Sequence, residues 1–459
     1  MHLDETIVAI ATPAGRGGIG VVRLAGNEAR TIAIPMLRLT HDLEPGRAHF
    51  GELIEPGTGQ RIDEVVATFF AKPHSYTTDD VVEISCHGSP VVLRHVVEMA
   101  IAAGARLAEP GEFTMRAFLN GRIDLTQAEA VRDLIESQTL YQAQVAARQL
   151  EGALSRRLLP IKQRLIELIA LLEAGIDFAE DDVSVAPDAQ IRSNIAAIRV
   201  PLEELLASFA FGKVVHEGLT LAIVGRPNVG KSSLFNQLVE RERAIVTATP
   251  GTTRDLVSET VAIGGIPVRL VDTAGIREAL DEAESIGVRK SMEALADADI
   301  VLVVRDASRA GKHALSSDEA AQDERLLALV RDREAIVVWN KIDAADDAAS
   351  IADGNGHLIT KVSALIGTGI DDLRKMVLGL AGGGVERESG LLTNVRQKQL
   401  VSASIAALDQ AEAAVAQKVP HEMLLLDLYN ALRPLDDITG ATTADDILNL
   451  IFSSFCIGK

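Results

Sequence analysis

Apolar and polar residues follow three different patterns along the chain. Up to about residue 120, short runs rich in β-branched residues, such as 6–11, 19–24 and 81–85, alternate with turns that contain Gly and Pro. Short strands separated by such breakers are typical of an α+β domain. The first part of the chain is therefore expected to fold around a sheet.

From Leu125 to about Lys213 the pattern becomes helical. Because proline lacks a backbone N–H and clashes with the preceding turn, Pro160 predicts that a helix begins or bends there. Apolar residues recur in this region at steps of three and four, which predicts one apolar stripe on a long helix: Leu158, Ile161, Leu165, Leu168 and Leu172.

A third pattern begins at Leu219, where short apolar runs alternate with amphipathic segments until about Leu380. This alternation predicts βαβ units and a mostly parallel sheet. The Gly run 382–384 predicts a flexible joint, and helical periodicity resumes from about Thr393 to Phe455. The α/β unit is therefore expected to be inserted into a helical domain whose halves flank it in the sequence.

The predicted fold class is multidomain, α/β and α. It combines an N-terminal α+β domain, a discontinuous helical domain and an inserted α/β domain. A length of 459 residues suits about three domains. The expected segments are 1–120, 121–215, 216–380 and 381–459.

Composition narrows the class of protein. With 47% apolar and 24% charged residues, the chain is not mainly disordered. No run approaches the roughly 18 apolar residues of a membrane span, and Asp4 and Glu5 stand where a signal peptide carries positive charges. Two cysteines suit a reducing compartment, so we expect a cytoplasmic protein without a membrane. The formal charge of −20 argues against broad nonspecific nucleic-acid binding.

The apolar run 219–224 leads directly into Gly225-Arg-Pro-Asn-Val-Gly-Lys-Ser232. The pattern G-x-x-x-x-G-K-S between a strand and a helix is typical of a phosphate-binding loop. In such a loop backbone N–H groups converge on phosphate oxygens. Lys231 would reach the terminal phosphates, and the Ser232 hydroxyl would bind Mg²⁺.

Three further elements follow in order, each at the end of an apolar run. Val271-Asp272-Thr-Ala-Gly275 offers a carboxylate for Mg²⁺ and a backbone N–H near a γ-phosphate. In Asn340-Lys341-Ile342-Asp343, the last carboxylate can accept from the N1–H and the exocyclic amine of guanine, a donor pair that adenine lacks. Ser363-Ala364 fits the remaining base-contacting loop. Together the elements predict a Ras-like P-loop G domain that binds GTP and GDP.

The group that positions the attacking water is not evident from these motifs. Many small GTPases have a glutamine directly after the D-x-x-G element, but Ile276 stands here and cannot form a hydrogen bond. Another group must position the water, and a cation must offset the transition-state charge. Composition does not choose among the charged side chains that follow: Arg277, Glu278, Asp281, Glu282 and Glu284.

Several longer strings connect the chain to a known family. Ala244-Ile-Val-Thr-Ala-Thr-Pro-Gly-Thr-Thr-Arg-Asp255 resembles switch I of the TrmE/Era/EngA group of bacterial GTPases. Other strings resemble the MnmE (TrmE) family of tRNA-modification GTPases, and the likeness spans the whole chain and the inserted-domain order. These strings are Thr6-Ile-Val-Ala9, Gly15-Arg-Gly-Gly-Ile-Gly20, Arg116-Ala-Phe-Leu-Asn-Gly-Arg-Ile-Asp-Leu125 and Phe455-Cys-Ile-Gly-Lys459.

The resemblance implies how the G domain works. It implies that K⁺ orders switch I when two G domains meet, so that hydrolysis depends on a homodimer. The implied K⁺ ligands are Asn228, Thr247, Thr249 and Thr252, and the implied Mg²⁺ ligands are Ser232 and Thr253. The implied catalytic residues are Asn228, Lys231 and Glu284, of which the last positions the water. Ala248 departs from the family, where a polar residue is usual.

The expected GTP-binding residues come from every one of these segments. They are Asn228, Val229, Gly230, Lys231, Ser232, Ser233, Thr247, Ala248, Thr249, Pro250, Gly251, Thr252, Thr253, Asp272, Thr273, Ala274, Gly275, Asn340, Lys341, Asp343, Ser363 and Ala364.

The N-terminal domain resembles the folate-binding module of the MnmE family and of glycine-cleavage aminomethyltransferases. Taken alone, Arg23 and Glu83 favour surface charge on a strand, an interpretation that the resemblance reverses. Pterin and carboxylate recognition needs a cation and an acceptor of these types. The implied ligand is 5-formyl- or methylene-tetrahydrofolate, and Arg122 and Lys459 complete the implied folate contacts. Arg122 replaces the more familiar lysine, which alters the hydrogen-bond geometry.

The resemblance also implies an activity. The expected protein is a K⁺-dependent GTPase that forms a heterotetramer with the FAD-dependent partner MnmG. The complex would install an aminomethyl or carboxymethylaminomethyl group at C5 of the wobble uridine in tRNA, using a tetrahydrofolate one-carbon unit. One alternative is a regulatory ribosome-assembly GTPase switch, which a C-terminal KH domain with its G-x-x-G loop would support. Another is an assembly scaffold whose G domain only reports the nucleotide state.

Overall fold

The computed structural model describes residues 4–177, 186–241, 258–272, 297–309, 316–345, 356–382, 390–441 and 458. The chain divides into two compact units. The first comprises Met1–Arg132, Gln149–Ser155 and Leu432–Lys459, and the second comprises Asp133–Arg148 and Arg156–Ala431. Among the described residues, no helix is long and apolar enough to cross a membrane.

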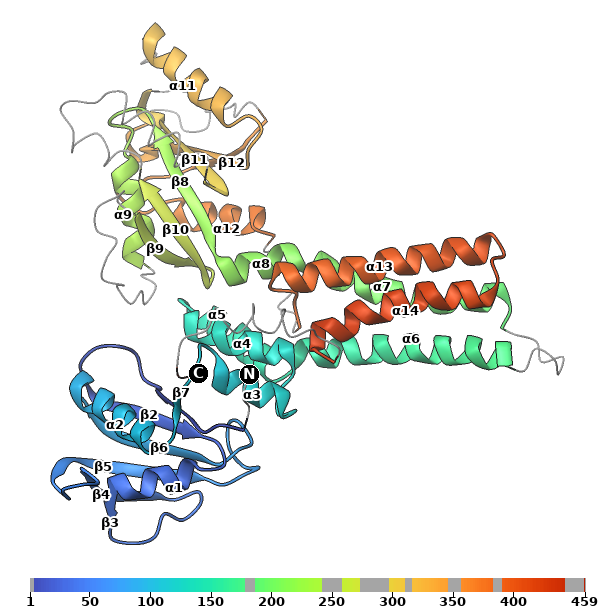
Figure 1. The fold of residues 1–459 in the computed structure, drawn as a ribbon. Helices are drawn as coiled ribbons and strands as arrows, with labels where there is room; N and C mark the ends of the chain where they lie inside the picture. Colours follow the sequence, from blue (N-terminus) through green and yellow to red (C-terminus); the bar gives the residue numbers. More distant parts are fainter. Residues whose placement is uncertain are drawn as a thin grey trace. The chain divides into compact units, whose positions relative to one another are not determined.

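The first unit is built around a seven-stranded sheet with the order β3-β4-β5-β6-β2-β1-β7 (Figure 1). Its strands are β1 (Ile7–Ile10), β2 (Gly17–Ala25), β3 (Leu37–Leu39), β4 (Ala48–Ile54), β5 (Arg61–Phe70), β6 (Val81–Gly88) and β7 (Arg106–Leu107). Neighbouring strands are antiparallel except for the parallel pair β1 and β7. The strands predicted at 6–11, 19–24 and 81–85 are confirmed as β1, β2 and β6.

Alternating side chains of this sheet enter two different cores. Val8 of β1 belongs to a core closed by α1 (Ala29–Ala33) and α2 (Pro90–Ala102). Ile7 and Ala9 belong to a second core, which contains Phe113 of α3 (Glu112–Leu119). Successive strand residues point to opposite faces, so one apolar run serves both layers. The short helix η1 (Ile34–Met36) follows α1, and α4 (Leu125–Glu136) follows α3.

The second unit contains a six-stranded sheet with the order β13-β12-β11-β8-β10-β9. Its strands are β8 (Leu219–Gly225), β9 (Ser258–Ile263), β10 (Ile266–Asp272), β11 (Ile300–Asp306), β12 (Ala335–Asn340) and β13 (Leu358–Lys361). All neighbours are parallel except β9 and β10. The predicted mostly parallel sheet is therefore confirmed.

Helices cover both faces of this sheet. Leu234 of α9 (Lys231–Arg241) and Leu373 of α12 (Ile370–Leu380) belong to the core on one face. Leu327 of α11 (Ser317–Leu329) belongs to the core on the other. The short helices η3 (Ala307–Arg309) and η4 (Ile342–Ala344) follow β11 and β12. The carboxyl ends of parallel strands meet at one edge, where ligands of such folds bind.

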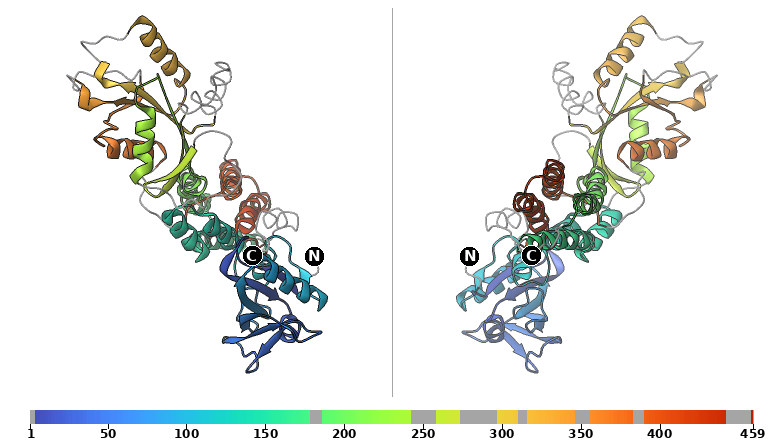
Figure 2. Two further views of the ribbon diagram at one scale, coloured as in Figure 1. Left: turned by 90° about the vertical axis from the view of Figure 1, so that its left-hand side faces the viewer. Right: turned by 90° about the vertical axis from the view of Figure 1, so that its right-hand side faces the viewer.

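Helices that precede and follow this sheet in the sequence pack together. They are α5 (Leu140–Leu150), α6 (Ala153–Asp177), α7 (Asp188–Ala207), α8 (Phe209–Glu217), α13 (Val395–Ala416) and α14 (His421–Thr439). Arg199 of α7 pairs with Asp409 of α13 at 3.0 Å. Tyr429 of α14 donates to a carboxylate oxygen of Glu173 of α6 at 2.6 Å. Accordingly, α6, α7, α13 and α14 lie side by side in Figures 1 and 2.

Of the two outcomes predicted at Pro160, a helix start or a bend, the helix start is not observed. Helix α6 begins at Ala153, and Pro160 lies inside it. Leu158, just before the proline, is completely buried, so the apolar stripe continues on its N-terminal side. Burial of that stripe outweighs the backbone hydrogen bond that proline removes. The helix predicted to continue to Phe455 is observed to Thr439, and residues 442–457 lie outside the described part of the chain.

Candidate functional site

The phosphate-binding loop joins β8 to α9, as the sequence predicts. Lys231 is buried at the first position of α9, and its Nζ donates to the carbonyl oxygen of Arg226 at 2.8 Å. Gly230 has a φ of +93°, and a Cβ at this position would lie 2.3 Å from Nδ2 of Asn340. Glycine is therefore required here by both the backbone conformation and the close approach. Ser232 and Ser233 follow in the first turn of α9, the end of a helix whose backbone N–H groups favour anions such as phosphate.

The guanine motif is hydrogen-bonded to this loop. The Nδ2 of Asn340 donates to the carbonyl oxygen of Val229 at 2.9 Å, and its Oδ1 accepts from the backbone N–H of Ala364 at 2.9 Å. The Nζ of Lys341 donates to the carbonyl oxygen of Asn228 at 2.6 Å. Three motifs that are at least 20 residues apart in sequence thus form one connected site.

Asp343 is held by the last of these motifs. The buried Ser363 donates from Oγ to Oδ1 of Asp343 at 2.5 Å, whereas Asp343 itself is exposed. An oriented and accessible carboxylate suits the donor pair on the Watson–Crick edge of guanine. The predicted guanine contacts are therefore brought together.

Asp306 lies at the carboxyl end of β11 and belongs to none of the predicted motifs. Its Oδ2 pairs with Nζ of Lys341 at 2.7 Å, and Ser308 donates to its Oδ1 at 2.6 Å. Burial alone would raise the pKa of this carboxyl, but the hydrogen bonds from Lys341 and Ser308 hold it below its ordinary value. Its place at a strand's carboxyl end is the pattern that could have identified it.

Asp272 is the last residue of β10 and stands opposite Ile223 of β8 in the register. Its backbone thus lies at the same sheet edge as the phosphate-binding loop. Among the described residues, no group of three or more His, Cys, Asp or Glu could hold a metal ion. The remaining predicted residues lie outside the described part of the chain: Thr247, Ala248, Thr249, Pro250, Gly251, Thr252, Thr253, Thr273, Ala274, Gly275 and Glu284.

A second cluster brings together three of the four predicted folate contacts. Arg23 and Glu83 face each other on β2 and β6, and Nε of Arg23 donates to Oε1 of Glu83 at 2.8 Å. The Arg23 guanidinium lies 5.6 Å from the ring centroids of Tyr76 and of Phe113. The guanidinium of Arg122 lies 5.1 Å from the same Tyr76 ring. Periodicity gave no indication of either aromatic residue, because both are placed by tertiary packing.

Tyr76 remains a neutral phenol in this cluster. Burial raises its pKa, although Thr114 and the two nearby arginines, Arg23 and Arg122, partly oppose the shift. Its hydroxyl lies 2.9 Å from Oγ1 of Thr114. The ring is therefore fixed at one end and presents its faces to the two guanidinium groups.

The C-terminal residue Lys459, the fourth predicted folate contact, lies outside the described residues, but its neighbour Gly458 is described. A Cβ on Gly458 would lie 2.2 Å from the carbonyl oxygen of Ile10, so the backbones touch. Ile10 pairs with Val22, next to Arg23 in the register of β1 and β2. The backbone of Gly458 therefore lies against β1, close to the strand position of Arg23.

Two other features of the first unit are separate from these sites. Burial raises the pKa of Cys86 to about 12, so this thiol is not a nucleophile at neutral pH.

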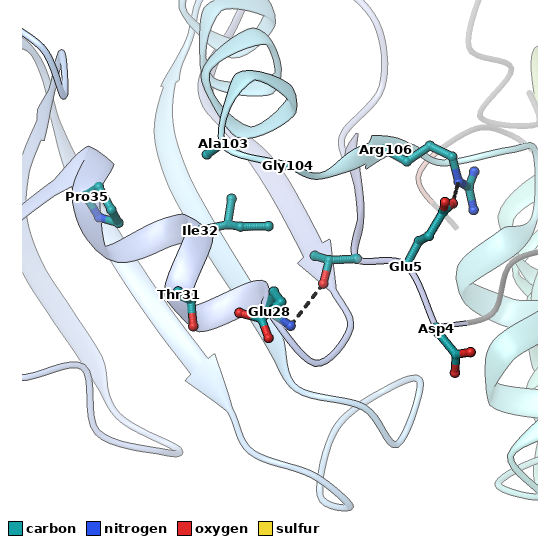
Figure 3. A pocket seen from close by; sticks show the side chains of 10 residues that line it. Asp4, Glu5, Glu28, Thr31, Ile32, Pro35, Ala103, Gly104 and Arg106 are labelled. Atoms are coloured by element: carbon teal, nitrogen blue, oxygen red, sulfur yellow. Dashed lines mark hydrogen bonds and ion pairs between the residues drawn. The ribbon is translucent and has the colours of Figure 1, made fainter.

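A pocket of about 440 Å³ contains three acidic residues, Asp4, Glu5 and Glu28, and none of the predicted site residues (Figure 3). Glu5 is paired with Arg106 at 2.7 Å there.

Two relatives match the chain over its whole length. The tRNA modification GTPase MnmE of Koribacter versatilis (strain Ellin345) is 67% identical over 463 residues. That of Aquifex aeolicus (strain VF5) is 43% identical over 458 residues. Both matches cover 100% of this chain and 100% of the relative.

The family descriptions agree with these relatives. The MnmE helical domain matches residues 125–456, and the N-terminus of the GTP-binding protein TrmE matches residues 6–122. This chain belongs to the MnmE family. The resemblance seen in the sequence is thereby confirmed, and the chain is a GTP hydrolase of the tRNA-modification GTPases. Among solved structures, the G domain of the T. maritima FeoB iron transporter is 24% identical to this chain. The alignment covers 36% of this chain and 98% of that domain, with a TM-score of 0.27. The family assignment does not depend on this structural match.

Proposed function

We propose that this chain is a K⁺-dependent GTPase that acts in tRNA modification with the FAD-dependent partner MnmG. The two proteins form a heterotetramer that installs an aminomethyl or carboxymethylaminomethyl group at C5 of the wobble uridine. The chain binds GTP at one site and a tetrahydrofolate derivative at the other. The observation that supports this most is that an MnmE-family chain carries both a connected guanine site and the Arg23–Glu83 cluster.

Mg²⁺ and K⁺ belong to the phosphate-binding loop in this proposal. The side chain of Asn228 offers a neutral amide oxygen, the atom type that a cation ligand needs. Its backbone, at φ +63°, is held by the hydrogen bond from Lys341 to its carbonyl oxygen. Neutral oxygen ligands suit a large monovalent cation, which supplies the positive charge that an arginine finger supplies in other GTPases. The Mg²⁺ ligands are Ser232 and Thr253, and the K⁺ ligands are Asn228, Thr247, Thr249 and Thr252.

Turnover of GTP in KCl and in NaCl at equal ionic strength tests this part of the proposal. We expect KCl to raise turnover by about ten-fold or more, since a correctly placed cation stabilises the transition-state charge. Asn228→Ala should remove the difference between the salts, and Glu284→Ala should lower turnover in both. Gln163→Ala, which removes an exposed amide on α6, is the matched control. Equal rates in the two salts for the unmodified chain would contradict K⁺ dependence.

The second site fits 5-formyl- or methylene-tetrahydrofolate. Arg23 and Glu83 offer a donor and an acceptor side by side, and Tyr76 and Phe113 flank them with aromatic rings. A few polar groups among aromatic walls are what a planar heterocycle with an anionic tail requires. When bound, tetrahydrofolate supplies the one-carbon unit. Arg122 and Lys459 complete the proposed contacts.

Titration of the full-length chain with 5-formyl-tetrahydrofolate tests the second site. Arg23→Ala should weaken binding roughly ten-fold or more, because hydrogen bonds to charged groups contribute about 1.5–3 kcal/mol. Arg38→Ala is the control: Arg38 makes a similar 2.7 Å cross-strand pair with Glu52, on the β3 edge of the same sheet. An unmodified chain that hydrolyses GTP but binds no folate would contradict the one-carbon part alone.

The proposed homodimer uses the exposed β4–β5 part of the first sheet, on the face opposite α1 and α2. Phe50 of β4 and Val66 of β5 stand opposite each other and are 65% and 38% exposed. Adjacent exposed apolar side chains indicate an association surface.

The formal charge of −20 leads us to assign much of the tRNA-binding surface to MnmG, because phosphate contacts need clustered Lys and Arg. Tight tRNA binding by this chain alone would contradict that assignment. We also propose that the protein is cytoplasmic. Its proposed domain segments are 1–120, 121–215, 216–380 and 381–459.

A further inference from the structure

The second residue of the phosphate-binding loop, Arg226, is buried. Its side chain is only 6% exposed, although arginine is among the residues that are least often buried. Its Nε donates to Oδ1 of Asp323 at 2.7 Å, and its Nη1 lies 2.8 Å from Oε1 of Glu319. The Arg226 side chain therefore points away from the loop, and its guanidinium pairs with two carboxylates of α11.

These two carboxylates lie four residues apart, so they share one face of α11. Asp323 is 3% exposed, and its second oxygen accepts from Nε of Arg305 at 3.2 Å. Glu319 forms a capping box with Ser316 at the start of the helix. The N-terminal half of α11 is thus held rigidly, and it holds Arg226 in turn.

Arg226 also supports the loop through its backbone. Its carbonyl oxygen accepts from Nζ of Lys231, the residue expected to reach the terminal phosphates. A buried guanidinium is stable only when it is paired, because an isolated buried charge is strongly unfavourable. The position of that carbonyl is therefore fixed by the pairing of the Arg226 side chain with Asp323 and Glu319.

The same ion-pair network also contacts the strand that leads into the guanine motif. The Arg305 guanidinium lies 4.5 Å from the ring centroid of Trp339, the residue that directly precedes Asn340. The residue after Arg305 is Asp306, which pairs with Lys341. Movement of α11 would therefore disturb the loop and the guanine motif together.

We propose that Arg226 is a positioning residue for GTP binding and hydrolysis: by pairing with Asp323 and Glu319 it fixes the phosphate-binding loop to α11 and sets the anchor point of Lys231. It acts through Lys231 and does not contact the nucleotide. The proposal rests on GTP binding at this site. GDP binding by the unmodified chain tests that premise, and differences between variants test the role of Arg226.

Dissociation constants for GDP and turnover of GTP by full-length variants test the proposal. We expect Arg226→Ala to weaken GDP binding by about ten-fold or more and to lower turnover. Arg226→Lys keeps the charge without the forked geometry, so it should recover only part of the loss. Because Arg226→Ala and Asp323→Ala remove the same interaction, their effects should not add in the double variant.

The control separates positioning from general destabilisation. Arg309→Ala removes a more exposed partner of the same Glu319 at 3.0 Å and leaves the pairs of Arg226 intact, so GDP affinity should stay within about two-fold. A purely structural role would lower the melting temperature without nucleotide but leave the GDP affinity of the folded protein unchanged. Wild-type affinity and turnover in both Arg226 variants, or an equal loss in Arg309→Ala, would overturn the proposal.

Discussion

At the scale of single residues, one ammonium group connects the guanine motif to the phosphate-binding loop. The Nζ of Lys341 donates to the carbonyl of Asn228 at 2.6 Å and pairs with Asp306 at 2.7 Å. An ammonium group has three donors on a flexible stem, so a fixed carboxylate decides where it points. Asp306 therefore orients Lys341 toward the loop.

Asp306→Asn tests this orientation, because it keeps the shape of the side chain and removes its charge. We expect the dissociation constant for GDP to rise roughly ten-fold, since a charge-assisted hydrogen bond becomes a weaker one. Calorimetric titration of the full-length chain measures it. Asp299→Asn is the control, because Asp299 accepts from the backbone of Thr220 at 2.8 Å, at the start of β8. Equal effects of the two substitutions would contradict the role of Asp306.

The pKa of Asp306 defines the pH range of this effect. The pKa is held below its ordinary value of 3.8, so the contribution of the ionised carboxylate is fully present above that value. It is lost as the pH falls through the lower pKa of the folded protein. The difference in GDP affinity between Asp306→Asn and the unmodified chain should therefore be the same at about pH 6 and pH 8.

Residues with fixed spacing could be predicted from the sequence, and their partners could not. Lys231, Asn340 and Ser363 stand in short motifs, and hydrogen bonds of Asn340 connect its motif to the phosphate-binding loop and to the Ser363-Ala364 motif. Arg226 also lies inside a motif, but its role depends on α11, which begins 91 residues later. A pairing across that separation follows from the packing of the sheet and helices, not from local pattern.

At the scale of elements, the tip of the β9–β10 hairpin is held by the chain just before α5. Thr139 donates to the carbonyl oxygen of Gly265 at 2.5 Å. Gly265 has a φ of +88°, and a Cβ there would lie 2.6 Å from Cβ of Tyr141. This hairpin ends at Asp272, the predicted Mg²⁺-side carboxylate, so the contact links the helices to the nucleotide site.

Gly265→Ala should lower the melting temperature of the chain, because it adds left-handed backbone strain to a clash with Tyr141. The loss of stability should exceed the roughly 1 kcal/mol expected from backbone strain alone. Gly379→Ala is the opposite control: Gly379 lies inside α12, a Cβ there would meet no described atom outside its own helix within 4 Å, and alanine favours helix. Melting temperatures that do not differ between the two variants would contradict this account.

The types of the helices and strands follow from the sequence where periodicity is strong. The start of α6 does not. The buried run of β8 and the alternation of helices and strands after it correspond to the observed sheet. Pro160 does not begin a helix, because the local rule about proline competes with burial of the whole stripe on α6. The cost of one missing hydrogen bond is local, whereas the gain from burial is shared along 25 residues.

At the scale of the whole molecule, the face of the first sheet opposite α1 and α2 carries a row of residues in register. Phe50 pairs with Val66, Val66 with Ser85, and Ser85 with Val21. On β4, Gly51 and Leu53 point to the opposite face from Phe50, because successive strand residues alternate between faces. Leu53 belongs to the core that α1 and α2 close. The row therefore lies on the face opposite these two helices, the same face that carries Arg23, Glu83 and the second core with Phe113. At the β4 and β5 end of this face Phe50 and Val66 remain exposed, and a partner surface would cover them there.

Phe50→Glu places a charge in the middle of this row and should convert the proposed homodimer into a monomer. Light scattering coupled to size exclusion would then give the mass of one chain in place of two. Because the family resemblance implies that hydrolysis needs two G domains that meet, GTP turnover in KCl should fall while GDP affinity stays unchanged. Val91→Glu is the matched control, since Val91 is 77% exposed on α2, the helix that covers the other face of the sheet. A dimeric Phe50→Glu would exclude this face as the interface, and a monomer with full turnover would separate hydrolysis from dimerisation.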